Sequence, residues 1–77
     1  MENNKDITIY TTNWCPYCNA AKRFLNEKGW SYQEINIEEK GWDRSKLLEV
    51  GKSMTVPQIT IDGEAIGGYD ELIKIYG

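Results

Sequence analysis

The chain has 77 residues, and its 12 acidic and 9 basic side chains give a formal net charge of −3 at pH 7. This balance, with a pI near 4.8, argues against a nucleic acid partner, because binding phosphates requires a basic surface. No stretch approaches the roughly 20 apolar residues of a membrane span, and the polar start, Met-Glu-Asn-Asn-Lys-Asp, carries no apolar leader. We therefore expect one cytoplasmic domain over residues 1–77 with no membrane partner.

Apolar periodicity and turn residues divide the chain into alternating strands and helices. In chain order we expect a strand at 7–10, a helix at about 16–28, a strand at 32–37, a loop at 38–41, a helix at about 43–50, strands at 58–61 and 64–66, and a helix at about 70–76. In the first helix, Cys18, Ala21 and Leu25 form one stripe that would face the core. Pro16 suits the first turn of this helix, and Gly29 its end.

The order β-α-β-α-β-β-α predicts an α/β fold with a four-stranded mixed sheet flanked by three helices. The first β-α-β unit requires parallel strands joined by a right-handed crossover. The dipeptide Asp62-Gly63 is a strong hairpin signal, so the last two strands should be antiparallel.

Cys15 and Cys18 are the only cysteines, and they stand at the start of the first predicted helix. A four-ligand zinc site cannot be completed within the chain from two cysteines and no histidine. Two weaker alternatives are a zinc site within the chain, of which this pair would be only one half, and a packed pair of core cysteines. A Cys-x-x-Cys pair between a strand and a helix favours redox chemistry.

The helix start makes the two sulfurs unequal. Cys15 lies at the exposed end, where unpaired N–H groups favour a thiolate, so we predict a lowered pKa for the Cys15 thiol and assign it as the nucleophile. Lys22 or Arg23 could add to this effect. Cys18 lies on the buried stripe, so we assign it as the resolving thiol.

Two further motifs follow, Thr55-Val56-Pro57 at the start of a strand and Gly67-Gly68-Tyr69-Asp70 before the last helix. Together with Cys15-Pro16-Tyr17-Cys18, they make the chain from Ile7 to about Tyr76 resemble a dithiol glutaredoxin of the thioredoxin-like superfamily. Three motifs in this order make the resemblance specific.

The resemblance implies a glutathione-dependent thiol–disulfide oxidoreductase with glutathione as co-substrate, no tightly bound cofactor and no metal. It also implies a cis Val56–Pro57 bond, with the backbone of Val56 pairing with the peptide thiol. Asp70 would take the γ-glutamyl ammonium, cap its helix, or do both. The glutathione-binding residues expected by position are Tyr17, Thr55, Val56, Pro57, Gly68, Tyr69 and Asp70.

The chain departs from this family in the residues before Cys15. Many relatives carry a lysine, poised for the glycyl carboxylate of glutathione, where this chain has Thr12. Lys40, Arg44 or Lys52 could replace it. Trp14 is more similar to thioredoxin, and it would either cover the sulfurs or form a docking surface for a protein.

Three functions are therefore weighed. The first is a monomeric glutaredoxin that reduces disulfide-containing or glutathionylated proteins. The second is a redoxin reduced by a thioredoxin-type reductase, which donates electrons to a specific protein such as ribonucleotide reductase; Thr12 and Trp14 favour it. The third is an iron–sulfur cluster-binding module shared by two chains through Cys15, although Pro16 usually accompanies the catalytic type.

Overall fold

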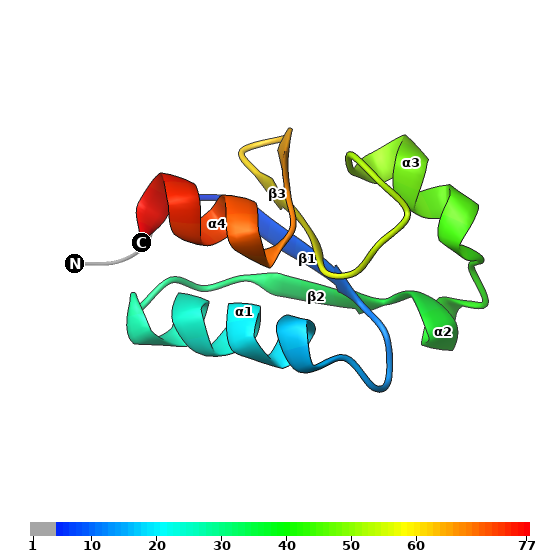
Figure 1. The fold of residues 1–77 in the computed structure, drawn as a ribbon, viewed down its shortest axis with the longest axis horizontal. Coiled ribbons are helices and arrows are strands. Elements are labelled where there is room, and N and C mark those ends of the chain that lie inside the picture. The colour runs from blue at the N-terminus through cyan, green and yellow to red at the C-terminus, as the bar shows by residue number, and fades with distance from the viewer. Residues whose placement is uncertain (1–4) are drawn as a thin grey trace.

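The computed structural model describes residues 5–77, which form a four-stranded sheet in the order β2-β1-β3-β4 (Figure 1). The elements are β1 (Ile7–Thr11), α1 (Pro16–Glu27), β2 (Gln33–Asn36), α2 (Ile37–Lys40), the 3₁₀ turn η1 (Arg44–Lys46), α3 (Leu47–Val50), β3 (Gln58–Ile61), β4 (Glu64–Gly67) and α4 (Tyr69–Tyr76). No helix of residues 5–77 is long and apolar enough to cross a membrane.

The sheet is mixed, as predicted, with β1 parallel to β2 and antiparallel to β3, which in turn is antiparallel to β4. Asp62 and Gly63 close the β3–β4 hairpin with positive φ angles of 55° and 83°. Two consecutive positive φ angles match the right-handed twist of paired strands, which is why Asp-Gly is favoured here.

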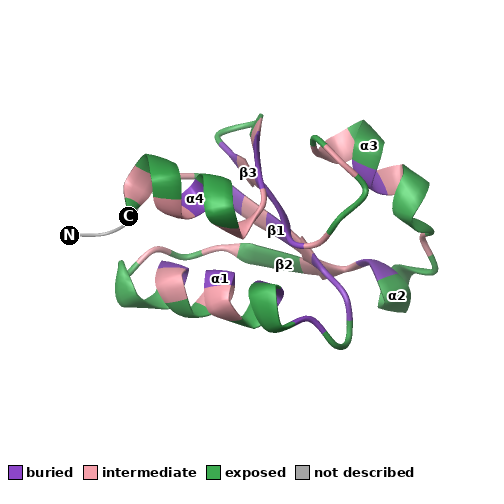
Figure 2. Cartoon of the chain, in the orientation of Figure 1, coloured by how far each residue is buried: buried purple, intermediate pink, exposed green. Residues whose placement is uncertain are grey.

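The core lies between the sheet and the adjacent helices α1 and α4 (Figures 1 and 2). Ile9 and Ile59, paired across β1 and β3, are fully buried with Leu25 of α1 and Leu72 of α4. The predicted stripe of α1 is confirmed, since Cys18, Ala21 and Leu25 are its buried residues. This packing brings the starts of α1 and α4 close to each other, with the rings of Tyr17 and Tyr69 6.1 Å apart.

The prediction of a loop at 38–41 is wrong, because residues 37–40 form the one-turn helix α2, so the sheet has four α-helices beside it rather than three. The Asn36 side chain caps this turn by accepting hydrogen bonds from the N–H groups of Glu38 and Glu39. Gly41 ends it with φ +73°, a left-handed conformation that glycine adopts readily.

The predicted helix at 43–50 is divided into η1 and α3, which end at Gly51. Asp43 caps η1 by accepting from the Ser45 N–H. Leu47 is buried, whereas the neighbouring Leu48 is 55 % exposed.

Candidate functional site

The two cysteines form a disulfide at the first turn of α1, with their Cα atoms 5.1 Å apart. Cys15 is the N-cap residue and Pro16 begins the helix, as expected. The Cys18 N–H donates a hydrogen bond to Cys15 Sγ over 3.0 Å. The same donor can stabilise a thiolate at Cys15 in the reduced protein, because helix-start N–H groups have no intrahelical partner.

Cys15 is more accessible than Cys18, but it is not the exposed group that was predicted. Its exposed fraction is 8 %, against 1 % for Cys18. Its sulfur is bonded to that of Cys18 and accepts the Cys18 N–H at the first helical turn. Lys22 is also not free to favour the thiolate, because its Nζ lies 3.1 Å from Glu34 Oε2 on β2.

The loop before Cys15 is held by its own side chains. Thr12 is buried, and its hydroxyl donates to the Trp14 carbonyl over 3.3 Å. Asn13 receives a hydrogen bond from the Asn36 amide at 2.9 Å, which ties this loop to the start of α2. The Trp14 side chain is 83 % exposed, so it extends into solvent and does not cover the sulfurs.

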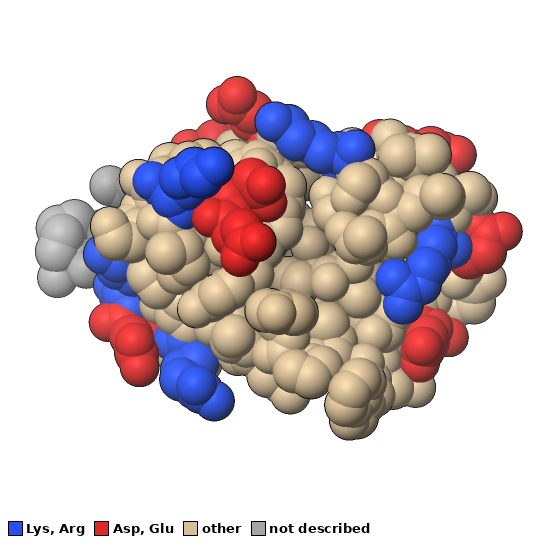
Figure 3. Space-filling view, in the orientation of Figure 1, with Lys and Arg blue, Asp and Glu red and all other residues tan. Residues whose placement is uncertain are grey.

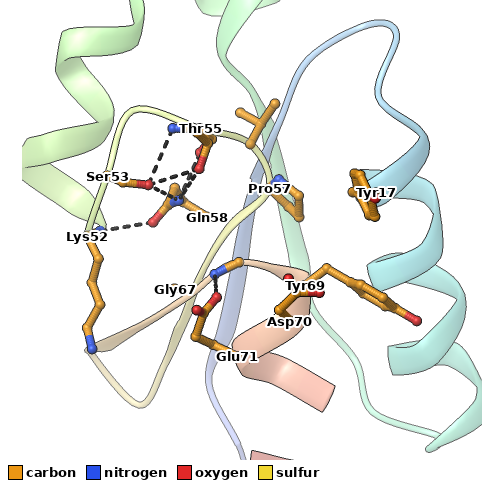
Figure 4. Close-up of a pocket in the computed structure, with 12 residues that line it drawn as sticks. Tyr17, Lys52, Ser53, Thr55, Pro57, Gln58, Gly67, Tyr69, Asp70 and Glu71 are labelled. Atoms are coloured by element: carbon orange, nitrogen blue, oxygen red, sulfur yellow. Dashed lines mark hydrogen bonds between the residues drawn. The ribbon is translucent and has the colours of Figure 1, made fainter. Parts of the chain in front are cut away.

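A groove of about 640 Å³ lies between the segment 52–57, the start of α4 and Tyr17 of α1 (Figure 4). This volume lies within the roughly 300–1,000 Å³ of small-molecule sites. All seven residues expected from the resemblance line it, as do five others. The lining residues are Tyr17, Lys52, Ser53, Thr55, Val56, Pro57, Gln58, Gly67, Gly68, Tyr69, Asp70 and Glu71.

The groove meets the disulfide through Tyr17, which lies between the cysteines in sequence; neither cysteine lines the groove itself. The rings of Tyr17 and Tyr69 are 6.1 Å apart, so they connect the starts of α1 and α4. The expected cis bond between Val56 and Pro57 is present. Within residues 5–77, the N–H and C=O of Val56 have no hydrogen-bond partner, which leaves them available to an extended peptide.

Two adjacent glycines allow the β4–α4 connection to approach the groove. Gly67 has φ +114°, and a Cβ there would lie 2.9 Å from Glu71 Cγ. A Cβ at Gly68 would lie 3.1 Å from the Pro57 carbonyl oxygen. The N–H groups of Tyr69 and Asp70 then stand at the exposed first turn of α4, where an anion is favoured.

The charged residues of the groove are few, and they have different environments. Lys52 is the one of the three candidate basic residues that lines it. Arg44 instead donates to the Met54 carbonyl. Figure 3 shows that acidic and basic side chains are interspersed around this face, whose centre is largely uncharged.

The alternative role of Asp70 as a helix cap is wrong, because Glu71 performs it. Glu71 Oε1 accepts from the Gly68 N–H over 2.9 Å. This hydrogen bond is the largest influence that holds the pKa of Glu71 below its usual value of 4.5, and the ammonium groups of Lys74 and Lys52 act in the same direction. Asp70 is thus left exposed at the groove.

Glu71→Gln is expected to flatten the acid side of the stability profile. Because the pKa of Glu71 is lower in the folded chain, its capping contribution is present above about pH 4.5 and is lost as pH falls through the lowered value. The glutamine oxygen accepts the same hydrogen bond at every pH. Thermal unfolding between pH 3 and pH 7 should show a smaller acid loss in the variant, and parallel profiles would contradict this origin.

Sequence reasoning missed three lining residues, Ser53, Gln58 and Glu71. The spacing Gly68-x-x-Glu71 was an available signal, since glutamate at the third helical position commonly bonds back to the cap. Ser53 and Gln58 carried no comparable signal, because their partners lie in an irregular segment.

A four-stranded sheet in this order, with a Cys-x-x-Cys turn at the start of α1, defines a thiol–disulfide oxidoreductase of thioredoxin-like fold. Comparison with known proteins agrees with this class and indicates one family within it. The sequence profile described as Glutaredoxin matches residues 7–66. The chain is 43 % identical over 70 residues to Glutaredoxin 3 of Escherichia coli strain K12, covering 91 % of this chain and 84 % of that protein. It is 47 % identical over 66 residues to a glutaredoxin of Pseudomonas aeruginosa, covering 86 % and 79 %.

Solved structures show the same likeness. The buckwheat glutaredoxin–glutathione complex superposes with a TM-score of 0.80 at 27 % identity, over 94 % of this chain and 68 % of that one. The chain therefore belongs to the glutaredoxin family.

Proposed function

We propose that the chain is a glutathione-dependent reductase of protein disulfides and of glutathione mixed disulfides. The observation that carries this proposal is the groove beside the Cys15–Cys18 turn, lined by the start of α4 and by the backbone of Val56, which has no hydrogen-bond partner among residues 5–77. The glutathione complex of the buckwheat relative supports it further.

In the proposed binding mode, the peptide backbone of glutathione pairs with Val56 between Thr55 and Pro57. The γ-glutamyl carboxylate accepts from the N–H groups of Tyr69 and Asp70, and the γ-glutamyl ammonium pairs with the Asp70 carboxylate. Gly68 supplies the close approach, and Tyr17 bounds the groove at the cysteine end.

For a glutathionylated protein, the Cys15 thiolate attacks the glutathione sulfur. The mixed disulfide breaks, a Cys15–glutathione disulfide forms, and the protein thiolate leaves and takes a proton from water. A second glutathione, as thiolate, then attacks the sulfur of the bound glutathione. Glutathione disulfide forms, and Cys15 returns as thiolate.

For a protein disulfide, the same attack gives a mixed disulfide between Cys15 and the substrate. Cys18 then loses its proton and attacks Cys15 Sγ, so the substrate leaves as a dithiol and Cys15 and Cys18 become oxidised. This product is the disulfide of the present structure. Two glutathione molecules then restore the dithiol and leave as glutathione disulfide. Because one chain supplies both the sulfurs and the groove, we propose that it acts as a monomer, in the reducing cytoplasm.

A coupled assay tests the proposal. A glutathionylated peptide, glutathione, glutathione reductase and NADPH should give NADPH oxidation that requires the protein and saturates with the peptide. Replacing glutathione and its reductase by thioredoxin reductase should give little turnover. Turnover with thioredoxin reductase alone would overturn the proposal in favour of the second candidate, which the exposed Trp14 and the buried Thr12 favour.

A further inference from the structure

Gln58 lines the groove, and its buried side-chain amide forms all of its hydrogen bonds with one segment of the groove wall. The side chain is 1 % exposed. Its Oε1 accepts from the Lys52 N–H at 2.9 Å, and its Nε2 donates to the Thr55 carbonyl at 2.8 Å and to Ser53 Oγ at 3.0 Å. Since a carboxamide has two N–H donors and one oxygen, Gln58 has no N–H left to donate to a ligand.

The segment that it holds has no regular structure of its own. Residues 52–56 connect α3 to β3 without helix or strand, so their backbone groups depend on side chains for partners. Figure 4 shows the Gln58 amide within the turn of this segment, with hydrogen bonds to Lys52, Ser53 and Thr55. Gly51 completes the fit, because a Cβ there would lie 2.6 Å from Gln58 Oε1.

Gln58 is itself fixed by the sheet, since it begins β3 and pairs with Tyr10 of the central strand β1. The segment therefore takes its position from the sheet through one side chain. Four of its members, Lys52, Ser53, Thr55 and Val56, line the groove. A wall held in this way before binding reduces the ordering cost that a ligand must meet.

We propose that Gln58 is a positioning residue of the groove, which sets the efficiency of glutathionylated substrates by holding segment 52–56 in its binding conformation. This inference rests on the proposed function. Gln58 touches neither the sulfurs nor the ligand in this scheme, and it acts through the backbone of Lys52 and Thr55.

The test compares two replacements in the full-length chain. Gln58→Leu removes all hydrogen bonds of this side chain while nearly keeping its size. We expect it to lower kcat/KM for a glutathionylated peptide about tenfold or more. The rate of alkylation of reduced Cys15 by iodoacetamide, which needs no groove, should change less than about twofold. Ile61→Val, a core change outside the groove, controls for a general loss of stability.

Gln58→Glu provides a second measurement, the pH dependence of kcat/KM, which a general loss of stability would not explain. A protonated carboxylic acid can accept from Lys52 and donate to Thr55 as the amide does, whereas the ionised form can only accept. Burial raises the pKa of such a glutamate, so its kcat/KM relative to wild type should recover as pH falls from 8 to 5.5. Taking the ratio at each pH cancels the titration of Cys15.

The outcomes are distinct. Two results together support the inference. Gln58→Leu lowers kcat/KM about tenfold while the alkylation rate of Cys15 is unchanged, and the kcat/KM of Gln58→Glu relative to wild type recovers at low pH. If wild type turns over the peptide but Gln58→Leu matches it, or if Ile61→Val loses as much, the inference alone is overturned. If wild type gives no turnover with glutathione, the proposed function fails and the inference falls with it.

Discussion

Cys15→Ser is expected to abolish reduction of a glutathionylated peptide, with a loss of about three orders of magnitude or more, as for other essential nucleophiles. Cys18→Ser should keep this activity within about tenfold, because a second glutathione can resolve the Cys15–glutathione disulfide. The asymmetry follows from the structure, where the Cys18 N–H donates to Cys15 Sγ and Cys18 is the more deeply buried. The coupled glutathione reductase assay measures both.

A second substrate makes this test sharper. When the substrate is a disulfide between two protein thiols, Cys18 is needed to resolve the mixed disulfide efficiently. Cys18→Ser should therefore lose the activity on this substrate. Cys18→Ala serves as a matched control, since serine places a hydroxyl in a site only 1 % exposed. Activity that survives in Cys15→Ser and disappears in Cys18→Ser would reverse the two roles.

Gly67→Ala is expected to weaken both the fold and the groove. A side chain at φ +114° costs about 1–3 kcal/mol of folding free energy, and each kcal/mol lowers Tm by roughly 4–8 °C in a domain of this size. The new Cβ would also meet Glu71 Cγ at 2.9 Å and displace the carboxylate that caps α4. The Tm of thermal unfolding and the kcat/KM for the glutathionylated peptide should therefore both fall.

Gly63→Ala separates these two effects. Gly63 also has a positive φ, +83°, but a Cβ there meets nothing within 4 Å, and the residue does not line the groove. Gly63→Ala should therefore lower the Tm of thermal unfolding and leave kcat/KM for the glutathionylated peptide unchanged. Equal losses of kcat/KM in the two variants would show that Gly67 has no specific part in the groove.

Sequence patterns predicted the sheet and the groove well, and for identifiable reasons. The alternation of Ile7 and Ile9, the Asp62-Gly63 turn and the stripe through Leu25 each report a local conformation that the core also requires. The seven groove residues came from a family resemblance, whose motifs are the residues that converge in space.

Features that depend on specific partners were missed. Glu38, Glu39 and Lys40 are as polar as a loop, and only the Asn36 cap makes them a helical turn. Lys22 was one of two candidates for assisting Cys15, but Glu34 on β2 is its partner, and periodicity within α1 contains no information about that strand. The sequence pattern predicts only that Gln58 belongs to a strand, because its hydrogen-bond partners lie in a segment whose fold the pattern does not predict.

The reactive turn and the groove come from separate stretches of the chain, residues 12–18 and 52–71, joined at the ring contact of Tyr17 and Tyr69. The pairing of β3 with β1 brings them together, and it joins residues about fifty positions apart in sequence, as in the pair Ile7 and Ile61. Substitutions in the second stretch can thus change which partners are accepted and leave the thiol chemistry intact. Selectivity in this scaffold can evolve, or be engineered, without altering the cysteine turn.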